Sequence, residues 1–109
     1  MEVTSALGTI RIANDAVAQI VARAAAESYG VVGMAGKGLK KLLPGDRGVS
    51  VRGTADGLRI DLHVVVEYGL NLAEVGATVR SRVVYEVERL TRLPVAAVEV
   101  HIEDVRRSA

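Results

Sequence analysis

The sequence predicts an α+β fold in which two helices cover one face of a mostly antiparallel sheet, as in ferredoxin-like or KH-like domains. Three observations lead to this prediction. Four segments alternate apolar and polar residues, two longer segments repeat apolar residues at helical spacing, and an Asp-Gly pair separates two of the alternating segments. In chain order these signals predict β-α-(short α)-β-β-α-β.

The first strand and the first helix are expected near the N-terminus. Residues 9–13 alternate, so we expect a strand of the sheet with its two isoleucines facing inward. Asn14 and Asp15 follow and offer side-chain oxygens to the first amides of a helix. The spacing of apolar residues predicts that helix over 16–28.

The stretch from Gly30 to Gly48 has no regular pattern and is predicted as a connecting segment. Six glycines lie in it. Residues 38–43 are expected to form a short helix that ends at Pro44 and Gly45, because neither residue favours a helix interior.

A β-hairpin is predicted next. The segments 49–52 and 58–67 alternate in hydropathy, and Asp56-Gly57 lies between them. Asp-Gly between two alternating segments is a strong signal for a tight hairpin turn. Tyr68, at the end of the second strand, is expected to pack its ring under the sheet.

The second helix is expected to begin at Asn71, whose side chain caps it with Glu74 as the capping-box partner. Pro94 lies beyond its end, and residues 98–103 alternate as the last strand. The apolar stripe of this helix is predicted to consist of Leu72, Val75, Val79, Val83, Val87 and Leu90.

Polar residues are expected on the sheet face that turns away from the helices. The predicted members are Arg11, Arg59, Asp61, His63, Glu67, Glu99, His101 and Glu103. In a ferredoxin-like order the strands of the two histidines are not neighbours. Two strand spacings of ~10 Å are too long for one ion with metal–nitrogen bonds of about 2 Å. We therefore expect no metal site.

The composition narrows the classes of function. The chain has 109 residues, half of them apolar, which we interpret as one domain over 1–109 with its core at about 8–105. The net charge of +1 is too small to hold nucleic acid by bulk charge. Without cysteine, a nucleotide-binding loop or an assembled nucleophile and base, we expect neither enzyme activity nor a cofactor. No segment is long and apolar enough to insert directly into a membrane.

Three strings of residues are more specific than periodic patterns. They are Gly8-Thr-Ile-Arg-Ile-Ala13 with Tyr29-Gly-Val-Val-Gly-Met34, Gly38-Leu-Lys-Lys-Leu-Leu43 with Gly48-Val-Ser-Val51, and Ile60-Asp-Leu-His-Val-Val-Val-Glu-Tyr-Gly69 running into Asn71-Leu-Ala-Glu-Val75. Over about residues 8–105 the chain resembles the alkaline-shock, or envelope-stress-response, family of Gram-positive bacteria.

The resemblance implies a non-enzymatic cytoplasmic protein that takes part in the envelope stress response through protein–protein contacts. In the name-giving members of the family the protein self-associates, and a membrane-anchored partner holds it at the inner face of the membrane. The implied partners are therefore a second copy of the chain and a membrane-anchored protein. The family has several branches, and the tethered role belongs to only some of them.

The glycine-rich basic loop is the candidate interaction site. Its residues are Gly33, Gly36, Lys37, Lys40 and Lys41. We interpret it as a connecting or protein-binding loop. The alternative is a KH-like module that clamps the backbone of single-stranded RNA between Gly33 and Gly36. The low net charge and the absence of Phe and Trp favour the protein-binding interpretation.

Overall fold

The computed structural model describes residues 2–5, 8–34 and 48–107, with side chains from Arg11 onward. The mostly antiparallel strands and two helices form an α+β fold, which confirms the predicted fold class. The elements are β1 (Glu2–Ser5), β2 (Gly8–Arg11), α1 (Asn14–Ala26), β3 (Val31–Met34), β4 (Val49–Thr54), β5 (Gly57–Glu67), α2 (Leu72–Thr91) and β6 (Val95–Arg106).

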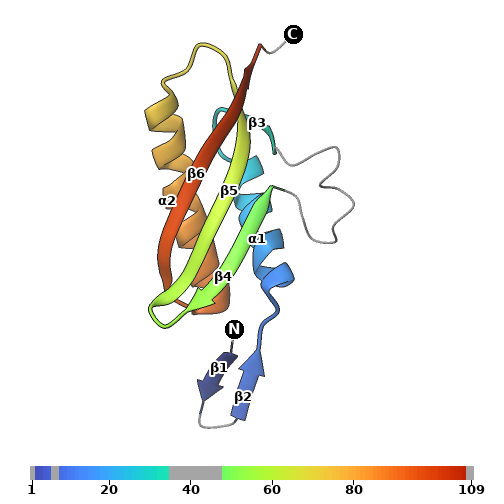
Figure 1. Ribbon diagram of the computed structural model, residues 1–109, viewed down its shortest axis with the longest axis vertical. Coiled ribbons are helices and arrows are strands. Elements are labelled where there is room, and N and C mark those ends of the chain that lie inside the picture. The colour runs from blue at the N-terminus through green and yellow to red at the C-terminus, as the bar shows by residue number, and fades with distance from the viewer. Residues whose placement is uncertain (1, 6–7, 35–47, 108–109) are drawn as a thin grey trace.

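The main sheet is built around β5 (Figure 1). Along one edge, β5 pairs antiparallel with β4 through Gly57–Leu62 and with β3 through Val64–Val66. Along its other edge, β5 pairs in parallel with β6 through Leu58–Glu67. Because parallel neighbours need a crossover, α2 connects β5 and β6 as the helix of a βαβ unit.

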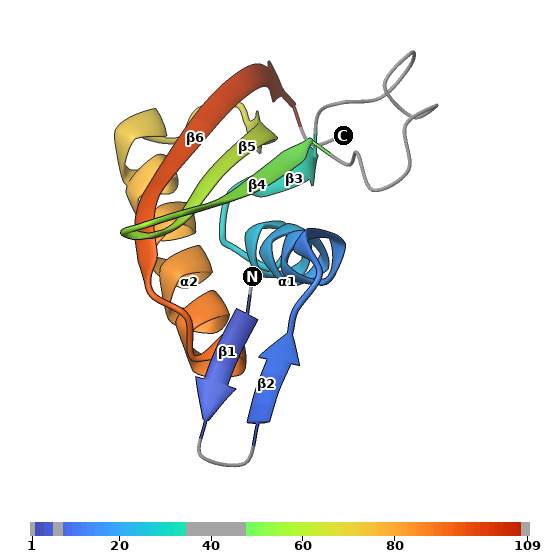
Figure 2. The ribbon, with the colours of Figure 1, turned by 60° about the horizontal axis from the view of Figure 1, so that its bottom comes forward.

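Both helices lie on the same face of the main sheet (Figure 2). The side chains of β5 alternate between the two faces, and those directed at the helices are fully buried. The core contains no aromatic ring and consists of Val17, Val21, Ala24 and Ala25 of α1, Leu58, Ile60, Leu62, Val64 and Val66 of β5, Val75, Val79, Val83 and Val87 of α2, and Val49, Leu93 and Val98.

The predicted hairpin is confirmed. Thr54 of β4 pairs with Gly57 of β5, so the two turn residues are Ala55 and Asp56, and Gly57 is the first residue of β5. The turn therefore begins one residue earlier than the Asp56-Gly57 signal indicated. The Thr54 hydroxyl donates to the Gly57 carbonyl at 2.8 Å. Gly57 has a φ of 132°, and a Cβ at this position would lie 2.5 Å from the carbonyl oxygen of Pro94. Both the backbone angle and the close approach require glycine here.

The predicted start of the second helix is also confirmed. The Asn71 side-chain oxygen accepts a hydrogen bond from the Glu74 amide at 3.1 Å. The four central valines of the predicted stripe are buried, whereas Leu72 and Leu90 at its two ends are exposed. The prediction was wrong for these two leucines because the core no longer covers the helix at its ends. The helix stops at Arg92, which adopts the left-handed conformation with a φ of 61°.

The predicted first strand has a different partner from the one expected. β2 pairs antiparallel with β1, and the two strands form a separate hairpin that extends away from the main sheet (Figure 1). Alternation indicates an extended chain but not its neighbour, and here the preceding segment satisfies the backbone of β2. In the connection from β2 to α1, Ile12 packs against the core. Arg11 therefore belongs to this hairpin and not to the main sheet.

The expected cap of the first helix is wrong. α1 begins at Asn14, so Ala13 holds the N-cap position and has no side chain that can accept a hydrogen bond. The side-chain amide of Asn14 instead donates from Nδ2 to the backbone carbonyl of Val51 on β4 at 3.3 Å. This bond joins the beginning of the helix to the edge of the sheet.

The stretch predicted as a connecting segment contains an additional strand. β3 pairs with Val64–Val66 of β5 and has an irregularity between Val31 and Gly33. Four residues are too few to show a strand periodicity, so only the pairing with β5 reveals the element. The short helix predicted over 38–43 lies outside the described residues.

Candidate functional site

The outward face of the main sheet brings together five titratable side chains from β5 and β6. Asp61 lies opposite Glu99, and His63 lies opposite His101, in the parallel register of the two strands. The fifth side chain, Glu103, contacts His63. We call these five residues the acid–histidine face.

The expected separation of the two histidines is wrong. Their imidazole rings stack with centroids 4.5 Å apart and an angle of 12° between the ring planes. The expectation assumed that the first strand lies between β5 and β6. Since that strand forms the separate hairpin, β5 and β6 are direct neighbours, and the two rings lie one strand spacing apart.

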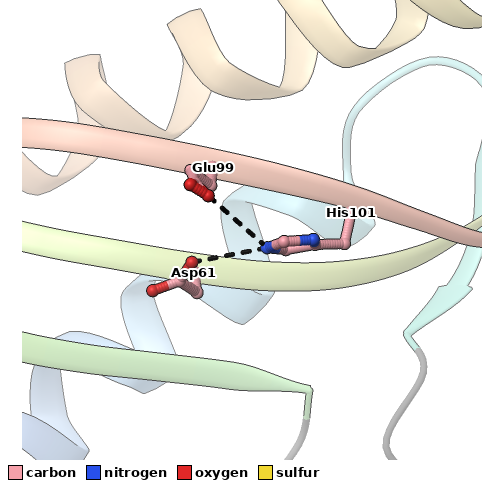
Figure 3. Close-up of side chains that lie close together, drawn as sticks. All are labelled: Asp61, Glu99 and His101. Carbon is pink, nitrogen blue, oxygen red and sulfur yellow. Dashed lines mark hydrogen bonds and ion pairs between the residues drawn. The ribbon is translucent and has the colours of Figure 1, made fainter.

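Two carboxylates approach the same nitrogen of His101 (Figure 3). His101 Nε2 lies 3.3 Å from Asp61 Oδ1 and 4.0 Å from Glu99 Oε1. Within the described part of the chain, these three residues form a group whose ligand atoms all lie within 4.8 Å of one another. The arrangement combines one imidazole with two carboxylates, which is a donor set suited to divalent metal ions.

A register shift between β5 and β6 brings Glu103 into contact with His63. In β6, Ile102 pairs with Val64 and Asp104 with Val65, so Glu103 is an extra residue between them. Such a bulge redirects a side chain. Here the Glu103 carboxylate lies 2.8 Å from His63 Nδ1. The carboxylate therefore holds the His63 ring in place against His101.

The acid–histidine face is accessible to solvent. The side chains of His101, Asp61 and Glu99 are 40%, 45% and 65% exposed. Arg59 and Arg52 face each other across β5 and β4, two residues along from Asp61, and bring positive charge to the other end of this surface. The site is an open patch on a sheet and not an enclosed cavity.

A groove of about 560 Å³ runs between α1 and α2, and its charged groups contact one another. Arg82 lies 2.9 Å from Glu27, and Arg89 lies 2.8 Å from Glu86. The hydrogen bond that Arg89 donates to the Glu86 carboxylate raises the pKa of Arg89 above its usual value. The first pair joins α2 to the end of α1 and the second lies within α2. Because these charged groups are paired with each other, we assign the groove no ligand.

The candidate interaction loop is described only at its beginning. Gly33 lies in β3 and pairs with Val65 of β5, so it belongs to a strand and not to a loop. A Cβ at Gly33 would meet no atom within 4 Å. The other four predicted residues, Gly36, Lys37, Lys40 and Lys41, lie outside the described residues.

Exposed apolar side chains gather at one end of the molecule, which periodicity did not indicate. Backbone hydrogen bonds from Glu67 to Gly30 at 2.8 Å and from Tyr68 to Arg106 at 2.7 Å bring together the turn after α1, the end of β5 and the end of β6. We call this surface the tyrosine end; it consists of the exposed Tyr29, Tyr68, Leu72 and Val105 and the half-buried Leu70.

The prediction for Tyr68 was wrong. Its ring is 57% exposed, and the guanidinium of Arg107 lies over it at 4.3 Å from the centroid. The strand ends one residue earlier, at Glu67, so the alternation that would direct the ring under the sheet no longer applies.

The family comparison covers nearly the whole chain. The alkaline shock protein 23 family, described as having a cell envelope-related function, matches residues 2–107. The chain belongs to this family. The resemblance seen in the three sequence strings is thereby confirmed, and no catalytic activity is known for the family.

Relatives within the alkaline shock family come from Gram-positive bacteria. The chain is 34% identical over 114 residues to YloU of Bacillus subtilis (strain 168), covering 97% of this chain and 95% of that protein. It is 32% identical over 107 residues to Spy1614 of Streptococcus pyogenes serotype M6, covering 91% of this chain and 88% of that protein.

A solved structure shares the fold of this alkaline shock family member. The MamM CTD, residues 215–293, superimposes with a TM-score of 0.54 at 17% identity, covering 83% of this chain and 96% of that chain. This likeness concerns the fold alone. Among the described residues, no helix is both long and apolar enough to cross a membrane.

Proposed function

We propose that this alkaline shock family member is a non-enzymatic, self-associating protein of the envelope stress response that acts through protein–protein contacts near the inner face of the membrane. The cell envelope-related role of the family supports the process. The observation that carries the contact mechanism is the tyrosine end.

The composition of the tyrosine end supports a protein contact. Tyr29 is 77% exposed and Tyr68 is 57% exposed, although each ring has a large apolar area. Tyrosine and arginine are enriched at protein interfaces because they combine apolar contact area with hydrogen bonding. Arg107, stacked over Tyr68, adds the second residue type to the same surface.

We assign this surface to a second copy of the chain. Turns and strand ends from three parts of the chain form it, so a partner copy would contact a surface fixed by backbone hydrogen bonds. Such preorganisation lowers the entropic cost of association. The membrane-anchored partner implied by the resemblance is then a separate contact, made by the assembled protein.

The absence of enzyme activity is part of the proposal. The titratable side chains of the acid–histidine face lie on an open sheet face, and His101, Asp61 and Glu99 are 40–65% exposed. Catalytic groups act most strongly where water is excluded. A turnover activity that is lost on replacing one residue of the acid–histidine face would contradict this part of the proposal.

Sedimentation equilibrium of the full chain tests the contact. We expect the weight-average mass to rise with concentration for the wild type and to remain that of a monomer for the double variant Y29S/Y68S. Tyr85→Ser is the matched control, since Tyr85 is 63% exposed but lies on the flank of α2. A wild type that stays monomeric, or a double variant that associates as well as the control, overturns the assignment.

Co-sedimentation with anionic liposomes tests the indirect character of membrane contact. We expect the purified chain to remain in the supernatant at physiological salt, because neither helix combines a basic face with large apolar anchors. Strong sedimentation without any protein partner contradicts the tethered arrangement.

A further inference from the structure

We propose that the acid–histidine face binds a divalent transition-metal ion of the zinc class through His101 Nε2 and the carboxylates of Asp61 and Glu99. This inference is independent of the proposed self-association. It concerns a different surface, on the outward side of β5 and β6, and needs no second copy of the chain.

The three donor atoms lie within 4.8 Å of one another, and the distance from His101 Nε2 to Asp61 Oδ1 matches that around one small ion. A tetrahedral zinc ion with bonds of about 2.0–2.2 Å holds its ligand atoms roughly 3.3–3.6 Å apart. His101 Nε2 is 3.3 Å from Asp61 Oδ1 and 4.0 Å from Glu99 Oε1. The Glu99 carboxylate would have to move closer to Nε2 on binding, and its side chain is 65% exposed, so it has room to rotate.

His101 Nε2 forms a hydrogen bond with Asp61 Oδ1 at 3.3 Å but not with Glu99 Oε1 at 4.0 Å. A charge-assisted hydrogen bond between an imidazole and a carboxylate is about 2.7–2.9 Å long, and both contacts of His101 Nε2 exceed this length. One ring nitrogen carries at most one proton, so it can donate to only one of the two carboxylates. A metal ion between them satisfies both carboxylates and the ring nitrogen together.

The charges also suit a divalent cation. Two carboxylates and a neutral imidazole balance the charge of a +2 ion, and Glu103 lies near the same face. The opposing charges are Arg59 and Arg52, which lie two residues from Asp61 along the paired strands. Three protein ligands leave at least one coordination position for water or for another ligand, as in open zinc sites.

His63 acts as a positioning residue in this proposal. Its ring stacks on His101 at 4.5 Å, and Glu103 fixes it through Nδ1 at 2.8 Å. The stacked ring limits the rotation of His101. Figure 3 shows His101 Nε2 directed at the two carboxylates. Such support around a metal ligand contributes to affinity without contacting the ion.

Titration calorimetry with ZnCl₂ on the metal-stripped full chain tests the site. We expect one saturable zinc ion per chain, and we expect His101→Ala and Asp61→Asn each to weaken binding at least tenfold. Glu67→Gln is the matched control, because Glu67 is a carboxylate on the same strand outside the group. Circular dichroism of each variant verifies that the sheet and helices are retained.

Two further measurements identify the ligand atoms. Long-range ¹H–¹⁵N spectra of the imidazoles should show a zinc-dependent shift at His101 Nε2. The absorption of the cobalt-substituted chain should show bands typical of nitrogen and oxygen coordination. The proposal is overturned if no saturable binding occurs, if His101→Ala binds zinc as tightly as the wild type, or if zinc leaves the Nε2 resonance unchanged. The last two outcomes would indicate that the carboxylates attract the cation without a built site.

Discussion

His63 and His101 lie opposite each other on parallel strands, and their rings stack at 4.5 Å, although 38 positions separate them in the chain. The relationship depends on the exclusion of β2 from the main sheet. If β2 lay between β5 and β6, the two rings would be two strand spacings apart and could not share a cluster. The assembly of the acid–histidine face is therefore a consequence of the topology.

The stacking of His63 on His101 predicts that His63 supports zinc binding. This effect on zinc affinity can be measured separately from any effect on the stability of the fold. We expect His63→Ala to lower zinc affinity about tenfold, as loss of a residue around a metal ligand does. His63→Phe should retain more of the affinity, because a phenyl ring still packs on His101. The free energy of unfolding should change by less than about 1 kcal/mol, since exposed ion pairs contribute little. Calorimetry and urea denaturation measure the two effects. Equal zinc affinity in all three proteins would contradict the positioning role.

Two glycines predict opposite effects of the same substitution. Gly57→Ala should destabilise the fold by about 1–3 kcal/mol or more, because its positive φ strains any side chain and the new Cβ would lie 2.5 Å from the Pro94 oxygen. Gly76→Ala should stabilise the fold by about 0.5–1 kcal/mol, because Gly76 lies in the second turn of α2 and a Cβ there meets no atom within 4 Å. Urea denaturation of both variants measures the signs. A stable Gly57→Ala variant would contradict the close approach of the hairpin to Pro94.

Much of the fold could be predicted from local signals, where one segment determines its own structure. The hairpin between β4 and β5 and the Asn71 cap are examples, since each depends on the conformation of neighbouring residues. The buried valines of α2 also follow directly from helical spacing.

Partner choice between distant segments could not be predicted in the same way. Alternation near Ile12 indicates a strand but does not say which strand it joins, and Val31–Met34 is too short to alternate visibly. The metal-ligand group of His101 was missed for the same reason, since its distances follow from the order of strands. A signal was present nevertheless: Asp61 and His63 repeat the spacing of Glu99 and His101, as expected for two strands that pair in register.

The two asparagines at the helix starts predict unequal effects on stability. Asn71→Ala should destabilise the fold by about 1 kcal/mol, because the Glu74 amide loses its acceptor at the N-terminus of α2. Asn14→Ala should have a smaller effect, since Asn14 is the first residue of α1 and makes only an exposed 3.3 Å bond to Val51. Urea denaturation of the two single variants compares them. Equal losses would contradict the assignment of Ala13 as the cap residue.

Replacing the lysines of the candidate interaction loop distinguishes a protein-binding function from an RNA-binding function. We expect the triple variant K37A/K40A/K41A to bind single-stranded RNA as weakly as the wild type, because the net charge of +1 and the absence of Phe and Trp leave little to hold RNA. Fluorescence anisotropy over a range of salt concentrations measures this. If the loop instead clamps phosphates, the wild type will bind with micromolar affinity, and the salt slope will flatten by roughly 0.7 for each phosphate contact that the variant loses. That result would favour the KH-like RNA-binding function over the protein-contact function. A low RNA affinity that is unchanged in the triple variant, together with self-association that depends on Tyr29 and Tyr68, would favour a protein contact at the tyrosine end.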